Sequence, residues 1–172
     1  MSRLAKILTA TAAAAAVVLT GTVAHAVITA RVGTFTEQQQ FVHQTDAWST
    51  SAAAFVNVPG ATTTVVVPAG TRRMLDARYT AESFCSGGGW CSVRIIVITP
   101  SGGVIELSPV VGTDFAFDSG STADNWESHA IERTSPFLAA GTYRVQVQAG
   151  VVAGATSVRL DDWTLAVERI RP

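Results

Sequence analysis

The sequence is short of the residues on which many enzymes and nucleic-acid-binding proteins depend. It has three histidines, two cysteines and a single lysine, Lys6. It contains no G-x-S-x-G motif, the strained turn that presents a nucleophilic serine in one large class of hydrolases. Residues 27–172 carry ten Arg against thirteen Asp and Glu, a net charge of −3 with no basic patch. This composition argues against a nucleic-acid partner.

Long hydrophobic runs are also missing, apart from one near the start of the sequence. Arg3 and Lys6 precede an apolar, alanine-rich stretch over residues 7–19, and Ala24–Ala26 reads A-H-A. A positive start, a short apolar centre and an A-x-A site are the features of a cleaved secretory signal peptide. The apolar stretch is too short for a membrane span. We therefore predict a signal peptide over residues 1–26, no membrane span and a secreted, extracellular location.

The two cysteines are separated by five residues, which is neither the C-x-x-C of redox motifs nor a zinc-ligand pattern. No further cysteine is present to complete a zinc site. In an oxidising compartment such a pair predicts a structural disulfide, Cys85–Cys91. The surrounding stretch, residues 73–99, reads as two long strands joined by a glycine-rich turn over residues 86–90. We expect these strands to pair as one antiparallel hairpin in which Glu82 faces Arg94.

Short alternating segments separated by Gly, Pro, Asn and Ser occupy the rest of the chain. We count eight to ten strands and no segment of helical period after the signal peptide. The pattern predicts an all-β protein, an antiparallel β-sandwich of jelly-roll type. The expected organisation is a polar leader over residues 27–40 and a single domain over residues 41–172. In the last strand the apolar residues alternate up to Leu160 and resume, one residue out of step, at Trp163. This change predicts a β-bulge at Asp161-Asp162, with the Trp163 side chain facing the core.

Several segments resemble known secreted bacterial proteins. LAAGTYRVQV, residues 138–147, resembles a strand of pre-peptidase C-terminal domains, carbohydrate-binding modules and C1q-type jelly rolls. The longer set VPGATTTVVVPAGTRRMLDARYTAESFC, WCSVRI, DFAFDS, WESHAIERT and RLDDW resembles small secreted actinobacterial β-sandwich proteins of unassigned function. This resemblance implies the fold and carries no catalytic residue over to this chain.

A cluster of carboxylates lies between residues 114 and 127. Asp114, Asp118 and Asp124 offer oxygen ligands at a density that suits calcium, although their spacing is not that of an EF-hand loop. The alternative is that these carboxylates cap turns in a solvated loop. A structural calcium ion is therefore a hypothesis, and no other cofactor is predicted.

Four tryptophans are many for a chain of this length. Aromatic rings beside carboxylates hold sugars by stacking and hydrogen bonding. Trp90, Trp126, Glu127 and His129 are therefore the predicted ligand-binding residues of a non-catalytic module for an extracellular glycan or surface protein. The alternatives are that each tryptophan caps the core of the sandwich and that His129 is an ordinary outward-facing strand residue.

Two other functions are alternatives to glycan binding. A plain sandwich of low charge is also typical of an assembly protein of C1q type, and the oligomeric state, a trimer included, is left open. Because His129 lies close in sequence to several carboxylates, a small secreted hydrolase is the second alternative. No pair of residues can be placed at catalytic separation from sequence, so we expect the chain not to be an enzyme.

Overall fold

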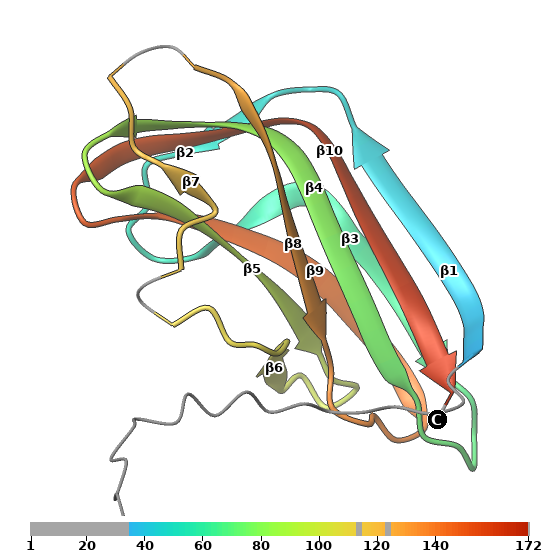
Figure 1. Cartoon of the computed structure of the whole chain (residues 1–172). Helices are drawn as coiled ribbons and strands as arrows, with labels where there is room; N and C mark the ends of the chain where they lie inside the picture. The colour runs from blue at the N-terminus through green and yellow to red at the C-terminus, as the bar shows by residue number, and fades with distance from the viewer. Residues whose placement is uncertain (1–34, 113–114, 123–124, 172) are drawn as a thin grey trace, which may run out of the picture. The chain divides into compact units, whose positions relative to one another are not determined.

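The computed structural model describes residues 35–112, 115–122 and 125–171. The predicted signal peptide over residues 1–26 lies outside these residues. The described chain contains ten β-strands in two antiparallel sheets (Figure 1). Among the described residues there is no helix long and apolar enough to cross a membrane.

Sheet A has the strand order β1-β10-β4-β8, with β2 also pairing with β10. Its strands are β1 (Phe35–Gln44), β2 (Trp48–Thr50), β4 (Met74–Gly87), β8 (Glu127–Thr134) and β10 (Ala155–Arg171). Sheet B has the order β3-β9-β5-β6, with β7 also pairing with β5. Its strands are β3 (Val56–Val67), β5 (Trp90–Ile98), β6 (Val104–Glu106), β7 (Asp118–Ser119) and β9 (Gly141–Val152).

The connections between the long strands make this sandwich a jelly roll. Strands β3, β4 and β5 alternate between the two sheets, and so do β8, β9 and β10. The last two strands fill the inner positions of each sheet, so that β10 lies between β1 and β4 while β9 lies between β3 and β5. Such crossing connections build the two Greek keys of a jelly roll. The predicted fold class is confirmed.

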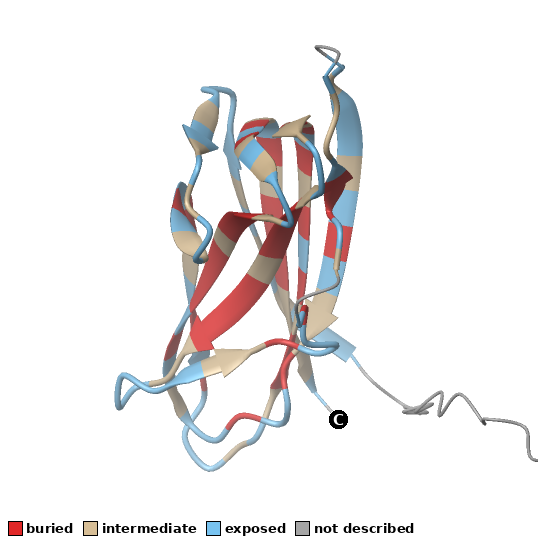
Figure 2. Ribbon diagram, turned by 90° about the vertical axis from the view of Figure 1, so that its left-hand side faces the viewer, coloured by how far each residue is buried: buried red, intermediate tan, exposed pale blue. Residues whose placement is uncertain are grey.

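Alternating side chains from the two sheets form the core. Strand β4 buries every second residue from Leu75 to Cys85, so bands of buried and more exposed residues alternate along it (Figure 2). Strand β5 buries the same phase from Cys91 to Val97 and also buries Ser92 and Ile96 of the other phase. Trp163 is 2% exposed and packs against Tyr79, with ring centroids 6.0 Å apart. In β4 the period of two that the sequence shows is thus the period of burial, because successive side chains of a strand point to opposite faces.

The predicted hairpin between β4 and β5 is wrong. Strand β4 pairs with β10 and β8, whereas β5 pairs with β9, β6 and β7. Glu82 therefore lies opposite Ser128 on β8, while Arg94 forms an ion pair with Glu106 at 3.0 Å. The two strands face each other across the core, so their apolar residues meet in the interior rather than side by side.

The Cys85–Cys91 disulfide is present, and both cysteines are buried. It joins sheet A to sheet B at the turn where the chain crosses between them. The turn is closely packed against the connection from β9 to β10. Gly89 has φ +75°, and a Cβ there would lie 2.4 Å from the carbonyl oxygens of Val152 and Ala153. A glycine is required at this position both by its backbone conformation and by this close approach.

Two boundaries differ from those expected. Strand β1 begins at Phe35, inside the predicted polar leader of residues 27–40, because Gln38, Gln39 and Gln40 pair with β10. Polar side chains do not prevent this pairing, since the ladder uses backbone groups. Pro and Gly usually end a strand, but Pro59-Gly60 lies inside the single strand β3, whose register shifts between Asn57 and Thr62.

The predicted bulge in the last strand is confirmed. The pairing of β10 with β4 shifts between Asp161 and Thr164, and Asp162 has φ +42°. The backbone N–H of Asp162 donates to the Asp161 side chain at 2.9 Å. One extra residue restores the inward phase, which returns Trp163 to the core.

Candidate functional site

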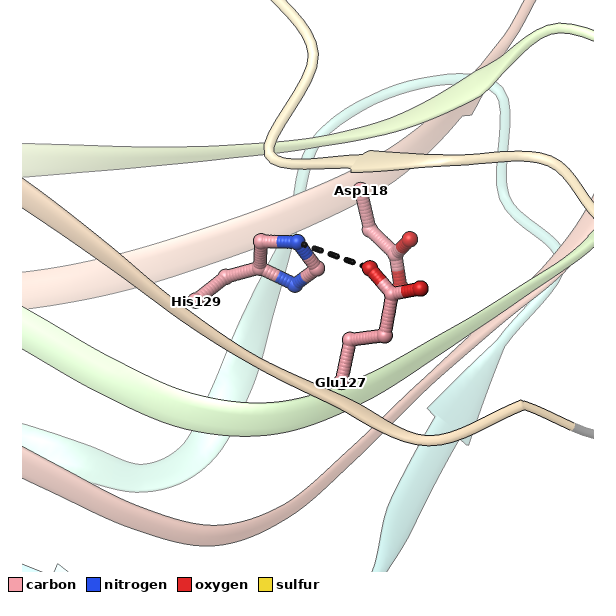
Figure 3. Close-up of side chains that lie close together, drawn as sticks. All are labelled: Asp118, Glu127 and His129. Atoms are coloured by element: carbon pink, nitrogen blue, oxygen red, sulfur yellow. Dashed lines mark ion pairs between the residues drawn. The ribbon is translucent and has the colours of Figure 1, made fainter.

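One cluster of polar side chains lies at the edge of the sandwich between β7 and β8. Asp118 comes from β7, and Glu127 and His129 come from β8 (Figure 3). One carboxylate or imidazole atom from each residue lies within 4.8 Å of the others. We call these three residues, together with Ser83 of β4, the edge cluster.

Alternation along β8 places the Glu127 and His129 members of the edge cluster on the inner face of sheet A. Glu127, His129 and Ile131 share that face, and their burial increases from exposed Glu127 to Ile131, which is 2% exposed. The His129 ring packs against Phe117, with ring centroids 5.5 Å apart. The expectation that His129 is an outward-facing strand residue is therefore wrong, because it shares the face of a core residue.

Ser83 links the members of the cluster through its hydroxyl group. It is fully buried, and its Oγ lies 2.7 Å from Asp118 Oδ2 and 2.8 Å from His129 Nδ1. A serine hydroxyl has one proton to donate, and an ionised carboxylate can only accept. Ser83 donates to Asp118 and therefore accepts from the Nδ1–H of His129. This places a proton on Nδ1 and leaves Nε2 directed at Glu127.

The members of this cluster come from distant parts of the sequence, so no local motif predicts it. Ser83 lies 46 residues before His129 and 35 residues before Asp118. The only signal is that Ser83 is a polar residue in the inward phase of a long apolar strand, where a buried hydroxyl needs a partner. The sequence predicts Asp118 as a calcium ligand and Glu127 and His129 as glycan-binding residues. The structure brings these three residues together.

Trp126 immediately precedes β8 and lies over the outer face of sheet A, against Phe84. Its ring is 6.2 Å from that of Phe84, and the guanidinium carbon of Arg159 lies 5.0 Å from the Trp126 ring centroid. Phe84 and Arg159 are themselves cross-strand partners on β4 and β10. An aromatic pair with a cation over it therefore spans β4, β10 and the residue before β8 on this face.

Two hollows lie on the same outer face. The first, of about 340 Å³, is lined by Thr80, Ala81, Glu82, Ser128, His129, Ala130 and Asp162. Glu82 and Ser128 are the next outward residues after Phe84 and Trp126, so this hollow adjoins the aromatic pair. The second, of about 250 Å³, is lined by Asp76, Arg78, Glu132, Ala166 and Glu168. The outer face of sheet A is thus polar and rich in carboxylates.

The structure divides the predicted glycan-binding set. Trp126 is on the outer face of sheet A, whereas Glu127 and His129 are on the inner face at the edge of β8. Trp90 precedes inward Cys91 on β5, so it faces outward from sheet B, and its Nε1 is buried with no acceptor among the described residues. The four residues do not form one surface. Whether each binds a ligand stays a prediction.

The predicted calcium group is described only in part. Asp114 and Asp124 lie outside the described residues. Asp118 is 6% exposed and belongs to the edge cluster. The calcium hypothesis stays a prediction, and the neighbours of Asp118 within 4.8 Å include His129, which this hypothesis did not contain.

Comparison with known proteins gives no family. No family model matches the chain, and no curated protein matches it. Among solved structures, a chain in the structure of infectious bursal disease virus strain Gx matches with a TM-score of 0.45 and 13% sequence identity. The match covers 77% of this chain and 32% of the viral chain. The chain thus spans about a third of the length of that protein. Strain Gt of the same virus gives 0.41 at 9% identity, over 77% and 32%.

A smaller protein also matches over most of its length. The carbohydrate-binding module of Cellvibrio mixtus lichenase 5A, in complex with cellotriose, has a TM-score of 0.30 at 18% identity, over 81% of this chain and 96% of the module. All three TM-scores are below 0.5.

Proposed function

We propose that the chain is a secreted, non-catalytic binding module for an extracellular glycan, and that the outer face of sheet A is its binding surface. One observation carries the proposal. The Trp126–Phe84 aromatic pair adjoins a hollow of about 340 Å³ to which Glu82 and Asp162 contribute carboxylates. We call Phe84, Trp126 and Arg159, with Glu82, Ser128 and Asp162, the outer-face site.

This combination matches the chemistry of a sugar ring. A pyranose has an apolar face of C–H groups, which packs on an aromatic ring, and a rim of hydroxyls, which donate to carboxylates. Arg159 is exposed and lies over Trp126. A sugar stacking on the indole takes the place of the guanidinium, which then donates to the sugar hydroxyls.

The secreted location rests on two features. The first 26 residues have the pattern of a signal peptide, and the Cys85–Cys91 bond fits an oxidising compartment. The hydrolase alternative has less support. The serine hydroxyl beside His129 belongs to Ser83, which is fully buried in the middle of a regular strand. A nucleophile must be reachable by its substrate and is usually presented on a strained turn.

The experiment is a binding assay with matched variants. Purified chain is tested on a glycan array and on insoluble cell-wall and plant polysaccharides. For the best ligand we expect Trp126→Ala to weaken binding about tenfold to a hundredfold, because stacking and the packing around it are lost. Glu82→Gln should weaken binding less, because the amide still accepts hydrogen bonds but carries no charge.

Two controls separate the outer-face site from general surface effects. Phe35→Ala removes an exposed aromatic ring from the start of β1, and Asp46→Asn removes an exposed carboxylate from the β1–β2 loop. Both should bind as the parent chain does. Failure to bind any glycan, or equal losses in Trp126→Ala and Phe35→Ala, would contradict the proposal.

A further inference from the structure

We propose that Asp118, Glu127 and His129 bind one divalent transition-metal ion, with the chemistry of Zn²⁺, and that Ser83 positions two of the three ligands. The site is independent of the outer-face site. It lies on the inner face at the edge of β8, between β8 and β7 (Figure 3).

The first argument is a distance. His129 Nε2 lies 3.5 Å from Glu127 Oε2. That is longer than the 2.7–3.2 Å typical of an N–H···O hydrogen bond. Two ligands of a tetrahedral zinc ion, each about 2.1 Å from the metal, lie about 3.4 Å apart. The separation of these two atoms is therefore that of neighbouring ligands around a shared ion.

The second argument is the orientation of the imidazole. The hydrogen bonds of Ser83 place a proton on Nδ1 and turn Nε2 toward the Glu127 carboxylate. A cation between Nε2 and the carboxylate, either a proton or a metal ion, holds these two groups together. Metal-binding histidines commonly have this arrangement, in which the other ring nitrogen donates to a neighbouring oxygen that fixes the ring.

The third argument is the burial of Asp118. Its side chain is 6% exposed, and the described residues supply a hydroxyl from Ser83 but no ion pair to an arginine. A buried carboxylate needs a compensating positive charge or several hydrogen bonds. A metal ion between Asp118, Glu127 and His129 supplies that charge to both carboxylates.

The ligand types select the class of metal. One imidazole and two carboxylates suit Zn²⁺ and related transition ions, whereas Ca²⁺ and Mg²⁺ prefer oxygen ligands alone. Three protein ligands also leave a fourth position of a tetrahedral ion for water or an outside ligand. The site therefore differs in its ion from the predicted calcium site of Asp114, Asp118 and Asp124, with which it shares only Asp118.

The test is a metal titration of the full chain, stripped with a chelator and carrying no polyhistidine tag. Zn²⁺ is added alone, in competition with a chromophoric chelator. We expect one ion per chain. His129→Ala should lower the affinity at least a hundredfold. Ser83→Ala should lower it about tenfold, as is usual for a residue that orients a ligand. His43→Ala, which removes an exposed histidine on β1, is the matched control and should leave binding unchanged.

A second readout keeps the test decisive if His129→Ala does not fold. In ¹⁵N spectra of the parent chain, Zn²⁺ should shift the Nε2 signal of His129 and leave its Nδ1 protonated. Glu127→Gln should weaken binding while retaining the fold, because Glu127 is exposed. Absence of zinc binding, an unshifted Nε2 signal on addition of zinc, or equal losses in His43→Ala and Glu127→Gln would overturn the proposal.

Discussion

Cys85 in β4 and Cys91 in β5 are bonded to each other across the two sheets, with their Cα atoms 5.7 Å apart. The bond closes a short loop and so lowers the entropy of the unfolded chain. In the chain-entropy model this raises the free energy of unfolding by about 2 kcal/mol. We expect reduction to lower the free energy of unfolding by about this amount without abolishing the fold.

The measurement is urea unfolding of the parent chain and of the Cys85→Ser, Cys91→Ser double variant, each with and without reductant. The variant should unfold as the reduced parent does, apart from the small effect of the two hydroxyls, and should not respond to reductant. A parent chain whose stability is unchanged by reductant would contradict this account.

The ion pair of Arg94 tests the sheet topology. Arg94 lies 3.0 Å from Glu106, and both side chains are partly covered. A double-mutant cycle with Arg94→Ala and Glu106→Ala should give a coupling energy of about 0.5 kcal/mol. The cycle with Glu82→Ala should give a value near zero, because Glu82 belongs to the other sheet. The opposite result would restore the hairpin that the sequence predicts.

The two tyrosines form a matched pair of buried phenols. Tyr143 donates to the carbonyl oxygen of Ala139 at 2.9 Å, whereas Tyr79 Oη is buried without a hydrogen-bond partner among the described residues. Burial also raises the pKa of Tyr79 well above its ordinary value. Tyr143→Phe should cost about 1 kcal/mol, while Tyr79→Phe should be neutral or stabilise the fold by up to about 1 kcal/mol. Thermal and urea unfolding of both variants check this, and a large loss in Tyr79→Phe would contradict it.

The carboxylate of Glu37 makes the free energy of unfolding depend on pH. The pKa of Glu37 lies below its ordinary value of 4.5, chiefly because Arg73 donates hydrogen bonds to both of its carboxylate oxygens, at 2.6 and 2.8 Å. Burial opposes this shift, and Arg169 and Arg171 add to it through their charge. A lowered folded-state pKa stabilises the fold above 4.5, and the contribution is lost as pH falls through the folded-state value.

The variant Glu37→Gln should therefore be less stable than the parent chain near neutral pH, and the difference should shrink as the solution is made acidic. Urea unfolding as a function of pH measures it, with Asp46→Asn as the control for an exposed loop carboxylate. A difference that stays constant across the acid range would mean that the charge of Glu37 does not contribute.

Alternation predicts much of the fold, because the face of each residue depends only on its position in its own strand. The inward residues of β4 and β5, the bulge at Asp161-Asp162, buried Trp163 and the disulfide all follow from it. The partner of each strand does not. Cys85 and Cys91 satisfy the same inward phase whether their strands lie side by side or face each other across the core. Short connections usually join neighbours in one sheet, and here they cross between sheets.

The candidate sites are less predictable than the fold. Trp126, just before β8, and His129 on β8 lie three residues apart, and extending the alternation of β8 back by one residue places them on opposite faces. Ser83 and Phe84 contribute to the two sites from another strand, and their roles depend on the register between β4 and β8. That register is a property of the folded sheet, and no local pattern of residues contains it.

The most direct test of the proposed function is to map the bound glycan on the labelled chain by ¹H–¹⁵N NMR. An oligosaccharide of the best ligand found on the array is titrated into the chain. We expect the largest shift changes at Glu82, Ser128 and Asp162 and at the Trp126 indole, all on the outer face of sheet A. Shift changes confined to sheet B, or no change with any glycan, would contradict the central claim.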